Sequence, residues 1–137
     1  SEWEYVARAG STTPFWWGTS ITPAQANYDG RYVYIGGGST GEYRQRTVPV
    51  GRFAANPWGL FNVHGNVWEW CEDVWHDNYN GAPTDGSPWL QHGDANRRVV
   101  RGGSWRNGPR HLRAANRYRN TTGVRHVYIG FRLARTL

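Results

Sequence analysis

The amino-acid sequence predicts a single α+β domain with short strands, little helix and many ordered loops. Three observations lead to this class. Only the segment at residues 1–10 has helical periodicity, and a few short segments alternate apolar with polar residues as half-buried strands do. The 18 glycines and 7 prolines favour frequent turns. The 137 residues are enough for one domain with its own core.

The helix is expected at residues 1–10 (SEWEYVARAG). Trp3, Val6 and Ala7 fall on one face at helical spacing, with Ser1 as the expected N-cap and Gly10 as the C-terminal stop. Because it is unusual for a chain to begin inside such a cap, we expect upstream sequence to be missing.

The strands are expected to be short and separated by long loops. Within residues 66–75, large apolar and polar side chains alternate through Trp70, so the aromatic face of this strand is expected in the core. A loop should occupy residues 78–93, which are rich in Gly, Pro and Asp. The other expected strands are 32–35 and 48–53 within the loop-rich residues 11–56, then 99–103 and 129–134.

The charge of the chain is strongly asymmetric. The net charge of +6 comes from 16 arginines without any lysine; no Asp or Glu follows Asp94, whereas 11 arginines lie from Arg97 onward. Such a basic segment can bind nucleic acid. Arginine also packs on Trp faces and pairs with carboxylates. The second use is favoured, because these arginines alternate with glycines and aromatic residues.

Cysteine content and hydropathy exclude several classes. Cys71 is the only cysteine, so the chain cannot form an internal disulfide or a thiol pair. The chain has no run of about 18 apolar residues and no basic-then-apolar leader, so we expect no membrane span and no export signal in this sequence.

Few residues are spaced for chemistry. The acidic cluster at 69–77 contains one Cys and one His, which is a poor set for zinc. Residues 62–69 (NVHGNVWE) are better suited to Ca²⁺, which prefers oxygen ligands in Gly-containing loops. Gly36–Gly41 lacks the Gly-Lys-Ser/Thr ending of a phosphate loop, and Ser104 lies in a Gly-Gly-Ser-Trp turn, so both are interpreted as turns.

Several motifs occur in a fixed order along the chain. They are EWEYVARAG at 2–10, FWWG at 15–18, NY at 27–28, VPVG at 48–51, NPWGLFNVHGNVWEW at 56–70, RVVRGGSW at 98–105 and IGFR at 129–132. Together they resemble the formylglycine-generating enzyme (sulfatase-modifying factor) family. The resemblance implies a variant of the C-type lectin fold over residues 1–137, normally preceded by a further strand and helix.

The resemblance also implies up to two structural calcium sites. The first set is the Asn62 and Glu69 side chains with the backbones of Gly65 and Val67. The second set is Asn27, the Tyr28 backbone, Glu42 and the Arg44 backbone.

The resemblance fails at the catalytic residues. Catalytic members carry two cysteines shortly after the Arg-Gly-Gly-Ser string, and these bind copper. Here residues 106–111 read RNGPRH. Soft thiolates are the ligands that hold Cu(I), so we expect no copper and no formylglycine-generating activity.

The C-terminal region, residues 98–137, is also similar to the variable region of diversity-generating retroelement proteins. Such proteins diversify AAC codons at adenines, which cannot yield Lys, Glu, Gln, Met or Trp, and none of these occurs at the positions expected to vary. We call them the display positions: Arg106, Asn107, Gly108, Arg110, His111, Tyr118, Asn120, Thr121, Thr122, Gly123, Val124, His126, Val127 and Tyr128.

Three functional hypotheses follow. The favoured one is a non-catalytic module that presents the display positions to a protein or glycan, by resemblance on a prokaryotic cell surface or phage particle. The first alternative is an oxidoreductase domain of the formylglycine-generating or sulfoxide-synthase type. The second is nucleic-acid binding through the Arg-rich C-terminal third, which aromatic and Arg side chains could support.

Overall fold

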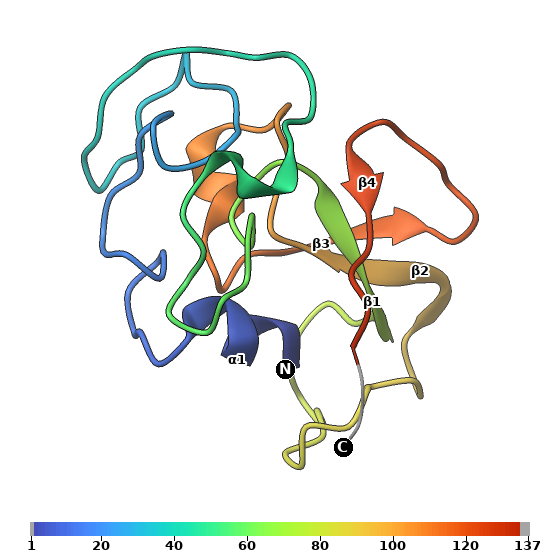
Figure 1. Ribbon diagram of the computed structural model, residues 1–137. Helices are drawn as coiled ribbons and strands as arrows, with labels where there is room; N and C mark the ends of the chain where they lie inside the picture. Colours follow the sequence, from blue (N-terminus) through green and yellow to red (C-terminus); the bar gives the residue numbers. More distant parts are fainter. Residues whose placement is uncertain (1, 135–137) are drawn as a thin grey trace.

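The computed structural model describes residues 2–134 and confirms the α+β class (Figure 1). The elements are α1 (Glu2–Arg8), the 3-10 helix η1 (Val50–Arg52), β1 (Trp68–Trp75), β2 (Asp94–Arg101), the 3-10 helix η2 (Pro109–Leu112), β3 (Arg117–Thr121) and β4 (Ile129–Gly130). The N-terminal helix is therefore confirmed, while the expected N-cap, Ser1, lies outside the described residues.

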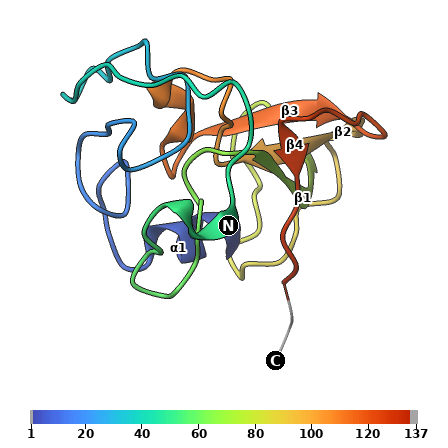
Figure 2. The same cartoon turned by 45° about the horizontal axis from the view of Figure 1, so that its top comes forward.

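The four strands form one mixed sheet in the order β3-β2-β1-β4 (Figures 1 and 2). The β1–β2 and β2–β3 pairs are antiparallel, and the short β4 runs parallel to β1. The register between β1 and β2 shifts between Trp70 and Val74, which indicates a bulge in the middle of β1. Residues 10–66, which form loops apart from η1, lie mostly to the left of the sheet in the view of Figure 1.

The sheet has two chemically different faces. Trp68, Val100 and Tyr118 lie on one face, since Val100 pairs with Tyr118 and side chains alternate along each strand. Helix α1 packs on the other face, where Trp3 Nε1 donates a hydrogen bond to Glu69 Oε2 at 2.6 Å. The first face is consequently free of the helix and is available for a site.

The main apolar core lies between the loops and η2. It contains the buried side chains Phe15, Ile21, Ala26, Tyr28, Tyr34 and Leu112. His64 connects its parts: Nε2 accepts a hydrogen bond from the Trp16 N–H at 3.1 Å, so Nδ1 must donate to the Leu112 carbonyl at 2.6 Å. Through His64, the N-terminal loops are therefore joined to η2, the element that precedes β3 in the chain.

Two of the expected strands are absent among the described residues. Residues 32–35 lie in an irregular loop in which Tyr34 is buried while Tyr32, Val33 and Ile35 are exposed, so this apolar run buries one ring and forms no strand. Residues 48–53 contain η1 instead of a strand, and Pro49 precedes its first residue. Proline fixes φ near the value of such a turn and removes a donor that a strand would need.

The remaining strands differ from expectation in extent. β2 begins five residues before the expected Val99, and the predicted closing strand at 129–134 is reduced to Ile129–Gly130. β3 was not predicted at all. Its sequence, RYRNT, has no apolar alternation, because polar residues occupy both faces of this edge strand.

Candidate functional site

The display positions lie on the surface. They occupy the turn after β2, η2, β3, the β3–β4 turn and the segment before β4. Each of the fourteen is exposed or half-buried. The residues interspersed with them include a buried frame, which consists of Arg101, Gly102, Gly103, Ser104, Pro109, Leu112 and Ala114. The structure therefore separates the segment into a buried frame and an exposed set.

Six display positions line one pocket of about 380 Å³. They are Arg106, Asn107, His111, Tyr118, Asn120 and Tyr128. The other lining residues are Trp68 from β1 and Val100 from β2, which are buried and thus contribute from beneath. These two were not predicted as site residues; the only signal was the alternation that places Trp68 on one face of its strand. The remaining eight display positions do not line this pocket.

Aromatic rings dominate the pocket. The Trp68 ring lies 5.8 Å from the Tyr118 ring and 6.3 Å from the His111 ring, centroid to centroid. Tyr128 stacks on His126 at 4.8 Å, and the Arg106 guanidinium lies 5.5 Å from the centre of the Tyr128 ring. Rings and guanidinium groups of this kind supply much of the binding energy at protein interfaces.

Backbone hydrogen bonds hold the loops around the pocket. Asp29 N–H donates to the Asn107 carbonyl at 3.0 Å, and Trp105 N–H donates to the Asn66 carbonyl at 3.0 Å. Gly103 has φ +74°, and a Cβ there would lie 2.7 Å from Leu112 Cδ1. Only glycine fits this close approach without strain. The loops that carry Arg106 and Asn107 are consequently fixed by the scaffold.

Two asparagines of the site are partly committed to local structure. Asn107 Oδ1 accepts a hydrogen bond from Ser104 Oγ at 2.7 Å, and Asn120 Oδ1 accepts one from the Thr121 N–H at 3.0 Å. Ser104 therefore has a turn role, as its sequence context predicted.

The pocket is basic. None of its eight described lining residues is acidic, and none of the ion pairs within residues 2–134 includes Arg106. Desolvation by partial burial, followed by the charges of Arg110 and Arg113, lowers the pKa of His111. The two neighbouring arginines thus add positive potential at the His111 imidazole.

The first expected calcium set, around Asn62 and Glu69, does not fit a cation in this structure, because its ligand groups already have other partners. Glu69 is buried, and Arg132 Nη2 lies 2.5 Å from Glu69 Oε1. Glu69 Oε2 accepts hydrogen bonds from Arg132 Nε and from Trp3 Nε1. Asn62 Nδ2 donates to the Val50 carbonyl, and the Gly65 carbonyl accepts from the Val67 N–H. A calcium ion would have to displace the guanidinium.

The second expected calcium set fits better. Asn27 is fully buried and its Oδ1 has no hydrogen-bond partner, which is an oxygen of the kind that Ca²⁺ prefers. Asn27 Nδ2 donates to the Arg46 carbonyl and to Asn66 Oδ1, which orients the amide. Glu42 is largely exposed and pairs with Arg44 at 3.0 Å. This set thus offers one buried oxygen without a partner, Asn27 Oδ1, and one largely exposed carboxylate, that of Glu42.

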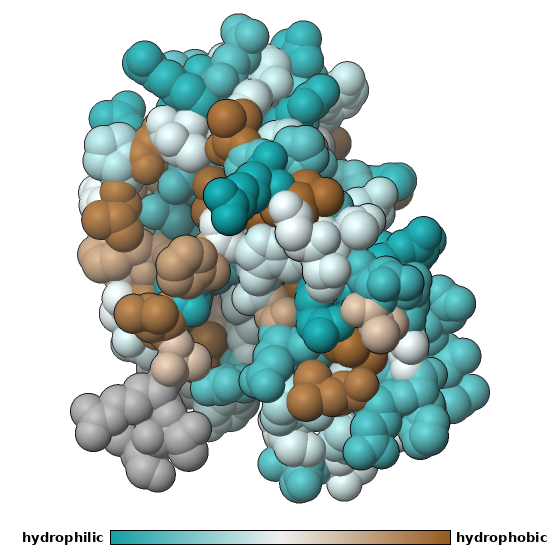
Figure 3. Space-filling model, turned by 90° about the vertical axis from the view of Figure 1, so that its right-hand side faces the viewer, coloured by the Kyte–Doolittle hydropathy of each residue, from teal (hydrophilic) through white to brown (hydrophobic). Residues whose placement is uncertain are grey.

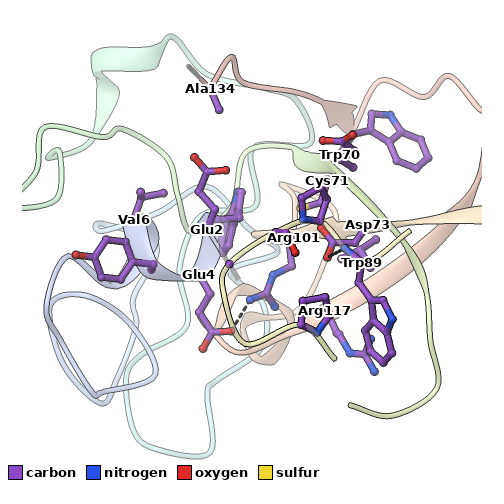
Figure 4. Close-up of a pocket in the computed structure, with 18 of the residues that line it drawn as sticks. Glu2, Glu4, Val6, Trp70, Cys71, Asp73, Trp89, Arg101, Arg117 and Ala134 are labelled. Carbon is purple, nitrogen blue, oxygen red and sulfur yellow. Dashed lines mark hydrogen bonds and ion pairs between the residues drawn. The ribbon is translucent and has the colours of Figure 1, made fainter. Parts of the chain in front are cut away.

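A larger hollow, of about 900 Å³, lies between α1, the sheet and the loop that precedes β2 (Figure 4). Arg101 crosses it to pair with Glu4 at 2.5 Å. Cys71 lies in its lining, and burial raises the pKa of this thiol to about 12. Because the thiolate is the reactive form, Cys71 is poorly placed for nucleophilic or redox chemistry near neutral pH.

The side that carries the β3–β4 turn is shown in Figure 3, where apolar side chains lie singly or in small groups among hydrophilic ones. Within residues 2–134, no helix has the length and apolar content needed to cross a membrane.

Comparison with known proteins was made for the whole sequence. The sulfatase-modifying factor enzyme 1-like domain family matches residues 1–137. The chain belongs to this family. The family's formylglycine-generating enzyme from Thermomonospora curvata is 33% identical over 147 residues, which cover 98% of this chain and 47% of that enzyme. The serine/threonine-protein kinase pkn1 of Chlamydia caviae is 33% identical over 138 residues, but only 20% of its length is covered.

Comparison with solved structures also places the chain in this fold. PvdO from Pseudomonas aeruginosa superposes with a TM-score of 0.78 at 38% identity, over 95% of this chain and 48% of PvdO. Treponema denticola variable protein 1 superposes with a TM-score of 0.71 at 29% identity, over 95% of this chain and 43% of that protein. The expected C-type lectin-like fold is thereby confirmed. The chain spans less than half the length of these relatives.

Proposed function

We propose that this chain is a non-catalytic ligand-binding module that presents its display positions to a protein or glycan. The observation that carries the proposal is the pocket over Trp68. Six display positions from separate segments converge there, although nothing in their sequence order requires them to meet. A buried frame that fixes exposed, chemically varied side chains is what a diversified binding surface needs.

The likeness to Treponema denticola variable protein 1 supports this proposal. Its decisive test is the DNA around the gene. A near-copy of the codons for residues 98–137, differing at template adenines and lying beside a reverse transcriptase gene, is the expected finding. The differing codons should then fall on the display positions and spare the buried frame. Differences spread equally over Gly103, Leu112 and Ala114 would contradict the proposal.

The alternative is catalysis like that of the related formylglycine-generating enzymes. Against it, residues 106–111 contain no cysteine, and burial raises the pKa of the single thiol, Cys71, to about 12. The purified chain should therefore leave a cysteine-containing sulfatase peptide unchanged in the presence of copper and oxygen. Mass spectrometry that detects formylglycine in the peptide would overturn the non-catalytic assignment.

A structural calcium ion is part of the proposal, and we assign it to the second set. Asn27 Oδ1 and the Glu42 carboxylate would hold it, together with the backbone carbonyls of Tyr28 and Arg44. Calcium should then raise the Tm of the chain by several degrees relative to EDTA, because it binds only the folded state. Glu42→Gln should reduce that increase while leaving the Tm in EDTA unchanged, since Glu42 is largely exposed. Equal increases in both proteins would exclude this set.

A further inference from the structure

The pocket over Trp68 is basic as well as aromatic, which restricts what it can bind. We propose that it takes a carboxylate side chain of an acidic protein segment, held by Arg106. This inference rests on the proposed function and narrows its ligand from any protein or glycan to a protein with an exposed Asp or Glu.

The first argument is the state of Arg106. Its side chain is exposed and lies over the Tyr128 ring, and no carboxylate among residues 2–134 pairs with it. Stacking on a ring uses the face of the guanidinium and leaves its N–H groups pointing outward. A carboxylate can accept two of them at once, in a paired geometry that an ammonium group cannot offer.

The second argument is the chemistry around Arg106. The other polar groups among the lining residues can all donate a hydrogen bond; they are the His111 ring, the amides of Asn107 and Asn120, the hydroxyls of Tyr118 and Tyr128, and the Trp68 indole N–H. The amide oxygens of the two asparagines each accept one hydrogen bond, from Ser104 and from Thr121, and their amino groups can donate to a ligand. A donor-rich pocket without any acidic residue is complementary to an anion.

The third argument selects a carboxylate on a protein over a phosphate chain. Residues of η2 and β3, together with Tyr128, line the pocket, and its volume of about 380 Å³ is at the small end of ligand sites, suited to one or two side chains. Tyr118, which lines the pocket, is 55% exposed, and Val127, which precedes the lining residue Tyr128 in the chain, is 78% exposed. Nucleic acid instead requires a basic groove that follows a backbone over several nucleotides. Exposed aromatic rings together with an arginine, as in this pocket, are enriched at protein interfaces.

The experiment is selection of random dodecapeptides displayed on phage against the immobilised full chain. Peptides enriched by the wild-type chain should contain Asp or Glu at a fixed place next to an aromatic or aliphatic residue. Synthetic copies of these peptides should bind Arg106→Gln at least about ten-fold more weakly, the loss expected for a hydrogen bond between charged groups. Arg106→Lys should give an intermediate loss, because it keeps the charge but not the paired geometry.

The matched control is Arg52→Gln, which removes the same charge from an exposed arginine of η1 and should leave the affinity unchanged. Enriched peptides that lack acidic residues, or acidic peptides that bind Arg106→Gln and wild type equally, would overturn this inference and leave the proposed function standing. If the chain enriched no peptide but bound single-stranded oligothymidylate with a steep loss between low and moderate salt, both would fail in favour of nucleic-acid binding.

Discussion

Arg101 and Arg106 lie five residues apart in the same basic segment but have opposite environments. The Arg101 side chain is 7% exposed, pairs with Glu4 at 2.5 Å, donates to the Asn116 carbonyl and lies 5.1 Å from the Trp3 ring. Arg106 is exposed and contacts the Tyr128 ring. The arginine-rich composition therefore combines two uses, one that joins α1 to the sheet and one that places a guanidinium on the surface.

The same division applies to the whole C-terminal segment. Its buried frame fixes the backbone, while the display positions extend from it into solvent. Ser104 of the frame donates a side-chain hydrogen bond to Asn107, a display position. Changes at exposed display positions without such a contact should have little effect on the frame. Substitutions that compare matched residues from the two sets test this independence directly.

The largest effect is expected at Arg101. Its replacement by Met should reduce the free energy of unfolding by about 3–5 kcal/mol, because three buried or half-buried contacts are lost together. Within residues 2–134, Glu4 keeps only Arg8 as a partner, the Asn116 carbonyl loses a donor, and the Trp3 ring loses the guanidinium that lies over it. The control is Arg119→Met, on the same face of the sheet, where the guanidinium lies over the Trp75 ring at 4.9 Å. This contact should be worth about 0.5–1 kcal/mol. Urea unfolding measures the stability of both variants. Equal decreases in the free energy of unfolding would show that the buried Arg101–Glu4 pair stabilises the fold no more than the exposed Arg119 contact does.

Leu112 should give the next largest effect. Its side chain is fully buried in the core, so Leu112→Ala should cost about 2–5 kcal/mol through lost burial and the cavity that remains. Val127→Ala, at an exposed display position, should change the free energy of unfolding by less than about 0.5 kcal/mol. Thermal unfolding followed by circular dichroism is sufficient for both. A comparable cost at Val127 would mean that this display position is part of the core.

The buried His64 predicts a pH dependence of stability. Burial lowers the pKa of His64 to about 4 in the folded chain, from an ordinary value of 6.5. The unfolded chain therefore binds more protons between these values, and stability is complete above pH 6.5 and falls as the pH decreases toward 4. The total loss from this group is about 3 kcal/mol. Protonation also removes the acceptor that binds the Trp16 N–H.

Urea unfolding at pH 7 and pH 4.5 should show this loss in the wild-type chain. His64→Gln should be less stable at pH 7, but its stability should decrease less between the two pH values. His126→Gln, at an exposed position, should behave as the wild type does. An unchanged pH dependence in His64→Gln would assign the effect to carboxylates instead.

The sequence was sufficient for the parts of the fold in which burial follows a simple period. Residues 66–75 alternate, and β1 occupies Trp68–Trp75. β3 could not be found in this way, because its inner positions hold Tyr118 and Asn120 while Arg117 packs on the Trp75 and Tyr79 rings from the other side. Cation–π packing places a charged residue where a periodicity argument expects an apolar one.

The sequence indicated which side chains of the candidate site are exposed, but not that six of them line one pocket. The interspersed pattern of residues 98–137 indicated which side chains face outward, and none of the display positions is buried. The convergence of Tyr118 and Tyr128 over Trp68 depends on the β1–β2–β3 register, which pairs Val100 with Tyr118. No local pattern specifies such long-range pairing. The pairing of Glu69 with Arg132, 63 residues away, was missed for the same reason.

The smallest effect on stability, and the sharpest test of the division, is expected from several display positions changed together. The triple variant Tyr118→Asn, His126→Asn and Val127→Asn uses a residue that an AAC codon encodes. All three side chains are exposed, so the free energy of unfolding should fall by no more than about 1 kcal/mol. The Tyr118 ring is the main loss, since it lies against Trp68. The expected result is a cooperative transition near the wild-type Tm together with loss of binding to the selected peptides. It would show that these surface residues can be replaced without altering the fold. Unfolding of the triple variant would instead show that stability and binding depend on the same side chains.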